Sequence, residues 1–90
     1  MLSLPSTLTQ AEATRTLQQL QQAVAALPVG SQAVVDASGL AVFDSAALAV
    51  LLECRRTALA AGKQLQVAGL PAPVATLARL YGVDGLLQAA

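Results

Sequence analysis

The chain has 90 residues, of which 56% are hydrophobic, and its five basic and five acidic residues give a formal net charge of zero. This length indicates a single small domain over residues 1–90, and the apolar fraction is typical of a packed core rather than of a disordered chain. Since the chain has one Tyr, one Phe and no Trp, it lacks both the basic surface and the stacking platforms of a nucleic-acid-binding protein.

The N-terminal third predicts a weak strand followed by a helix. Residues 2–4 and 7–8 are strand candidates, but Pro5 interrupts them and restricts them to the edge of a sheet. Thr9 and Glu12 have the spacing of a capping box, which marks a helix start. Apolar residues then recur every three or four positions, as on one face of a helix, at Ala13, Leu17, Leu20, Val24 and Leu27. A Pro-Val-Gly sequence ends this helix.

The middle of the chain predicts a central strand and a second helix. The apolar pair Val34 and Val35 is typical of a strand covered on both faces. Asp44 and Ser45 stand where the helix should begin, because their side-chain oxygens accept hydrogen bonds from the unpaired N–H groups of a first turn. We expect this helix to run from about Ser45 to Ala61, with Gly62 as its left-handed C-terminal cap.

The two sides of the second helix differ in the size of their residues. At about 100° per residue, one side collects the leucines predicted to face the core, Leu48, Leu51, Leu52 and Leu59. The opposite side is small and nearly uncharged in its first turns and suits close docking of another protein. We define the docking pad as the candidate partner-binding residues Asp44, Ser45, Ala46, Ala49, Val50 and Glu53. The alternative explanation is helix propensity alone, since alanine is the best helix former.

The last third predicts a strand and two helices. Leu65 and Val67 alternate with glutamines, as in a strand. Pro71 and Pro73 introduce a third helix. Its predicted inner side consists of Val74, Leu77, Ala78 and Tyr81. Residues 83–88 predict a short final helix.

The element order β-α-β-α-β-α predicts an α/β fold with a three- to four-stranded, mostly parallel or mixed sheet and right-handed crossovers. With three strands detectable, we expect the helices to pack mainly on one face. The other face would then need a partner, a fourth strand or contact with water, and the sequence leaves these three possibilities open.

The sequence offers little catalytic chemistry. It has no His and a single cysteine, Cys54, so it contains neither a Cys–His nucleophile nor a Cys/His metal cluster, and the lone thiol fits a reducing compartment. It has no phosphate-binding loop, and Asp36 with Asp44 makes no active site without a base or a pocket. The longest apolar run, residues 46–52, is far below the roughly 20 residues of a membrane-spanning helix. We expect a protein that is not an enzyme and has no cofactor and no metal.

Three segments resemble a STAS domain: residues 34–40, 43–52 and 61–69. The Asp-Ser step followed by a helix of small residues and leucines is the most specific part of this resemblance, which covers residues 31–87. The fold is shared by anti-anti-sigma factors, the tails of sulfate transporters and a small subunit of the Mla-type phospholipid transporter. Residues 74–83, with their Ala-Arg-Leu-Tyr run, are similar to the Mla-type subunit in particular. The N-terminus departs from the family pattern, because members usually open with a two-stranded hairpin.

The resemblance implies two alternative functions. In the first, the chain is a non-catalytic cytoplasmic subunit that docks through Ser45 on the ATPase subunit of an ABC transporter for phospholipids, which maintains outer-membrane lipid asymmetry. Its place at the inner membrane would then come from the complex with the permease and not from insertion. In the second, the chain is an anti-anti-sigma phospho-switch, and a serine kinase that is also an anti-sigma factor phosphorylates Ser45. The Ala-Arg-Leu-Tyr run favours transport.

Overall fold

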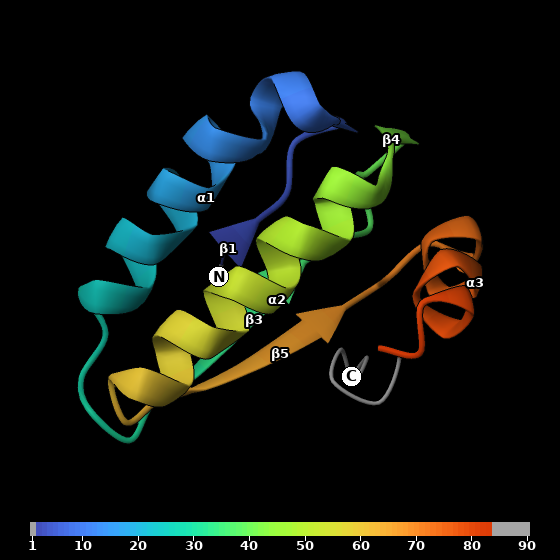
Figure 1. The fold of residues 1–90 in the computed structure, drawn as a ribbon. Helices are drawn as coiled ribbons and strands as arrows, with labels where there is room; N and C mark the ends of the chain where they lie inside the picture. Colours follow the sequence, from blue (N-terminus) through green and yellow to red (C-terminus); the bar gives the residue numbers. More distant parts are fainter. Residues whose placement is uncertain (1, 84–90) are drawn as a thin grey trace.

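The computed structural model describes residues 2–83, in which short strands and helices alternate (Figure 1). The elements are β1 (Leu2–Ser3), β2 (Thr7–Leu8), α1 (Gln10–Ala25), β3 (Gln32–Asp36), β4 (Val42–Phe43), α2 (Ser45–Ala60), β5 (Gln64–Ala68) and α3 (Ala72–Leu80). The predicted α/β class is confirmed. Residues 84–88, most of the predicted final helix, lie outside the described part of the chain.

A three-stranded parallel sheet in the order β1-β3-β5 forms the centre of the fold. β3 is the middle strand, since Val35 pairs with Leu2 of β1 and with Val67 of β5. This position confirms the predicted central strand, and β1 holds the edge position that Pro5 requires. β2 and β4 form a second, two-residue parallel pair, so the N-terminal segment supplies two short parallel strands instead of a hairpin.

The two long helices cover one face of the sheet. Figure 1 shows α1 and α2 side by side on this face, with α3 beyond the end of β5. Ala33 and Val35 of β3 are buried beneath the helices, whereas their neighbours along the strand are not. The helices therefore pack mainly on one side, as the sequence predicts.

The other face of the sheet is polar. Strand alternation and register place on it Ser3, Gln32, Val34, Asp36, Gln64, Gln66 and Ala68. The Gln32 side chain donates a hydrogen bond of 2.8 Å to the Gln66 side chain across β3 and β5. The expectation of a central strand covered on both faces is thus wrong for the described residues, and contact with water is the possibility that these side chains fit.

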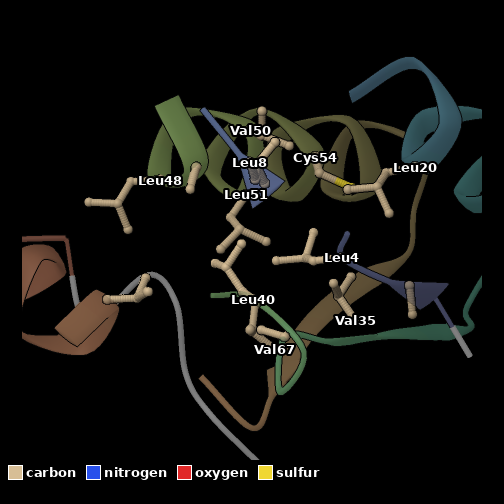
Figure 2. Packing of buried hydrophobic residues seen from close by; sticks show 14 of the residues in the cluster. Leu4, Leu8, Leu20, Val35, Leu40, Leu48, Val50, Leu51, Cys54 and Val67 are labelled. Carbon is tan, nitrogen blue, oxygen red and sulfur yellow. The ribbon is translucent and has the colours of Figure 1, made fainter. Parts of the chain in front are cut away.

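Leu51 lies at the centre of the core. Figure 2 shows it pointing from α2 toward Leu4 and Leu40, close to Val35 and Val67 of the sheet. The buried stripe of α2 consists of Ala47, Leu48, Val50, Leu51, Cys54 and Ala58. Three of these residues are small, Ala47, Cys54 and Ala58, and they allow close packing of α2 against α1 and the sheet.

The structure corrects the predicted burial of Leu52 and Leu59 on α2 and of Tyr81 at the end of α3. Leu59 was expected in the core but is 47% exposed, and Leu52 is only partly buried, whereas Leu48 and Leu51 are buried as predicted. The buried side of α2 is therefore rotated from the leucine side toward Ala47, Val50 and Ala58. On α3, Val74 and Ala78 are buried as predicted, whereas Tyr81 is 58% exposed. Tyr81 is the C-cap residue at the end of α3.

The ends of α2 agree with the sequence-based expectation. Asp44 is its N-cap, and the helix ends at Ala60, one residue before the predicted end. Gly62 has a φ of 75°, the left-handed conformation expected of a glycine after a helix. Within residues 2–83, none of the helices combines the length and the apolar character that crossing a membrane would need.

Candidate functional site

Asp44 caps two helices at once. Its Oδ1 accepts a hydrogen bond of 2.8 Å from the Ala46 N–H in the first turn of α2, as the sequence predicts. Its Oδ2 accepts a second one of 3.1 Å from the N–H of Gln10, the first residue of α1. This second contact joins residues 34 positions apart, so no local pattern could reveal it. The Asp44 carboxylate therefore links the two helix starts, in addition to the backbone pairing of β2 with β4, the short strands that lead into α1 and α2.

Ser45 is exposed at the head of α2. It lies in a shallow depression of about 330 Å³ with Gln10, Asp44, Ala46 and Ala49. The depression thus combines a hydroxyl, one carboxylate and small apolar side chains. Because the first N–H groups of a helix make this end partly positive, the position suits a hydrogen-bonding or negatively charged group.

A second depression continues along the two helices. We call it the interhelix hollow; its volume is about 290 Å³, and it is lined by Ala13, Thr14 and Leu17 of α1 and by Ala46, Ala49, Val50 and Glu53 of α2. Ala46 and Ala49 line both depressions. The docking pad is therefore one wall of a hollow, and α1 forms the other wall. The sequence did not identify the α1 residues as site residues, since it does not show which helix lies beside α2.

Val50 and Glu53 differ from the exposed residues of the docking pad. Val50 was expected on the outer side of α2, but it is 3% exposed and belongs to the core, so that placement is wrong (Figure 2). It can form only the floor of the interhelix hollow. Glu53 is partly exposed and pairs with Arg56, whose hydrogen bond lowers the pKa of the Glu53 carboxyl. Asp44, Ser45 and Ala49 are exposed, as a docking surface requires.

The other candidate for chemistry is Asp36. Hydrogen bonds from the side chain and then the backbone N–H of Ser38 lower the pKa of its carboxyl, and the N–H contact is 2.9 Å long. A lowered pKa is the opposite of what a general base working near neutral pH needs. Both carboxylates make structural contacts: Asp36 accepts a hydrogen bond within a turn, and Asp44 accepts hydrogen bonds at the two helix starts.

Cys54 has the environment of a packing residue. Its side chain is fully buried, and this burial raises the pKa of the thiol, which disfavours the reactive thiolate. Among residues 2–83, the acidic, His and Cys side chains form no cluster of three or more that could hold a metal ion.

Lys63 is a structural residue that the sequence did not reveal. It is 5% exposed, and its Nζ donates to the carbonyl oxygens of Val24 at 2.7 Å and Ala25 at 3.3 Å. These carbonyls end α1, where a positive charge is favourable. Asp44 precedes α2 and Lys63 follows it, so residues flanking α2 hold both ends of α1.

The comparisons with known proteins agree with this architecture. A family model described as "Mlab, STAS domain" matches residues 1–88. The match includes the N-terminal segment, which departs from the usual hairpin. No curated protein matches the chain closely enough to count as a relative. The match spans nearly the whole chain, and the chain therefore belongs to the STAS domain family.

Proposed function

We propose that this STAS domain is a non-catalytic subunit that binds the ATPase subunit of an ABC transporter for phospholipids. Docking uses the Ser45 end of α2, and the complex with the membrane permease keeps the chain at the cytoplasmic side of the inner membrane. In this role the protein supports the assembly or activity of a transporter that maintains outer-membrane lipid asymmetry. The description of the matching family model, "Mlab, STAS domain", supports this choice within the family.

The observation that carries the proposal is the surface at the head of α2. Ser45 is exposed there, and Ala46 and Ala49 line two adjoining depressions. Small side chains let a partner's backbone or side chains come close to a helix. A large side chain of the partner can then fill the depression beside them, and such well-packed pockets hold most of the binding energy of an interface. In such a contact the Ser45 hydroxyl can form a neutral hydrogen bond, which requires no counter-charge from the partner.

The alternative function is the anti-anti-sigma phospho-switch. The exposure of Ser45 favours it, because a kinase needs access to the hydroxyl. A phosphate there would carry a charge of about −1.5 to −2 beside the carboxylate of Asp44. Both oxygens of this carboxylate already accept hydrogen bonds. A partner that recognises phosphoserine would therefore have to supply donors of its own.

Substitution of Ser45 tests the proposal in cells that lack the natural gene. Ser45→Glu places a charge in the contact and should abolish function, whereas Ser45→Thr keeps the hydroxyl and should be nearly silent. Loss of binding alone does not separate the two functions, since acidic variants fail in both. Outer-membrane permeability and detergent resistance do separate them: we expect Ser45→Glu to lower resistance. If it leaves both at wild-type levels and alters a stress regulon instead, the transport function is wrong.

A further inference from the structure

The double contact of Asp44 links the proposed docking point to a second helix. One carboxylate oxygen accepts from Ala46 in the first turn of α2, and the other accepts from Gln10 at the start of α1. The N–H groups of a helix's first turn have no partner within the helix, so each of these contacts satisfies a donor that would otherwise need water. If either oxygen moves away from its donor, the N–H group of Gln10 or of Ala46 loses its acceptor.

The rest of the α1 start is capped by its own residues. The Glu12 carboxylate accepts from the Thr9 N–H at 2.9 Å and from the Thr9 hydroxyl at 2.7 Å. This capping box stabilises α1 but makes no link to α2. At this end the helix starts are linked by the Asp44 side chain and by the backbone pairing of β2 with β4, while Lys63 fixes the other end of α1. Asp44 thus adds a side-chain link between the two walls of the interhelix hollow near Ser45.

We propose that Asp44 is a positioning residue that couples the state of Ser45 to the first turn of α1. This inference rests on the proposed function in one respect, the use of the Ser45 end as the docking point. A negative group on residue 45 repels the adjacent carboxylate and competes with it for the Ala46 N–H. Asp44 then shifts, and the Gln10 N–H loses its acceptor. The α1 wall of the interhelix hollow therefore responds to the group that residue 45 carries, and α1 belongs to the docking surface.

Amide hydrogen exchange on the free, full-length chain tests this coupling without any partner. Asp44→Asn provides one carbonyl oxygen in place of two carboxylate oxygens, and asparagine is as good an N-cap as aspartate. We expect the Ala46 amide to keep its protection and the Gln10 amide to exchange about fivefold faster, the change that an ordinary hydrogen bond gives. Equal exchange of Gln10 in the variant and the wild type would overturn the inference.

A double-substitution cycle distinguishes coupling from a merely structural cap. Ser45→Glu should accelerate exchange at Gln10 in the wild-type background and have no further effect there in the Asp44→Asn background, because the link is already lost. Additive effects in the cycle would refute the coupling. If Asp44→Asn failed to fold, the absence of any effect of Ser45→Glu on Gln10 in the wild-type background would still refute it. As a control, Glu12→Gln weakens the α1 capping box and should leave the response of Gln10 to Ser45→Glu in place.

Binding to the transporter ATPase gives a separate readout. We expect Asp44→Asn to weaken this binding at temperatures where the variant is fully folded, while its melting temperature falls by no more than the roughly 4–8 °C that one lost hydrogen bond gives. Unchanged binding would remove α1 from the docking surface. If the wild-type chain itself did not bind the ATPase, the proposed function would fail, whereas the exchange experiments would still decide the coupling.

Discussion

Truncation of Leu51 to alanine tests the packing on which the site depends. Leu51 is fully buried and lies on the side of α2 that faces the sheet (Figure 2). Its removal creates a cavity between α2 and the strands that support the docking pad. A second leucine on the same helix provides a matched control, because Leu59 was expected in the core from the sequence but is about half exposed, at 47%.

The size of the effect follows from burial. Replacing a buried leucine by alanine costs about 2–5 kcal/mol, through lost transfer free energy and the residual cavity. Because the Leu51 side chain is completely buried, we expect Leu51→Ala to cost about 3 kcal/mol, near the middle of this range. Domains of this size have a free energy of unfolding of roughly 5–14 kcal/mol, so the variant should lose about a fifth or more of it. At about 4–8 °C per kcal/mol, the melting temperature should fall by roughly 12–24 °C.

Thermal unfolding followed by far-ultraviolet circular dichroism measures both variants. Leu59→Ala should stay within about 0.5 kcal/mol of the wild type, as an ordinary surface substitution does. If Leu51→Ala also stays within that range, or if Leu59→Ala is the more destabilising of the two, α2 is rotated and the position of the docking pad is wrong.

Two further predictions concern the ends of α1. Lys63→Met keeps the aliphatic stem but leaves the Val24 carbonyl without its charged donor, so it should cost about 1–3 kcal/mol in a thermal or urea melt; no loss would mean that this contact is absent in solution. Hydrogen bonds from the Thr9 backbone N–H and then its hydroxyl lower the pKa of Glu12 from 4.5. This contribution to stability is therefore complete above the unfolded-state pKa and lost as the pH falls through the lower folded-state pKa. Glu12→Gln should flatten the decline of the melting temperature in acid, and an unchanged acid profile would contradict this assignment.

The helix starts and the central strand could be predicted because their signals are local. Asp44 as an N-cap and β3 as the central strand depend on neighbours in the chain, and the structure confirms both, although it does not cover both faces of β3. The orientation of α2 was less predictable. Large leucines suggested the core side, whereas close packing against α1 and the sheet selected a stripe that includes Ala47 and Ala58, and it buried Val50.

The contacts that join segments far apart in the chain had no sequence signal. The acceptors of Lys63 lie 39 and 38 residues away, and the second donor to Asp44 lies 34 residues away. Such pairs become visible only when the helices are placed side by side. The α1 wall of the interhelix hollow, with Thr14 and Leu17, was missed for the same reason.

Binding of Ala49→Arg to the transporter ATPase tests the central claim most directly. Ala49 is exposed on the docking pad, and Ala60 is exposed at the far end of the same helix, so Ala60→Arg is a matched control for charge and size. Since an unpaired charge in a dry contact is costly to bury, Ala49→Arg should weaken binding by more than about tenfold without lowering the melting temperature. Ala60→Arg should bind like the wild type. Wild-type affinity of Ala49→Arg, measured by titration of the purified subunits, would contradict docking through the Ser45 end of α2.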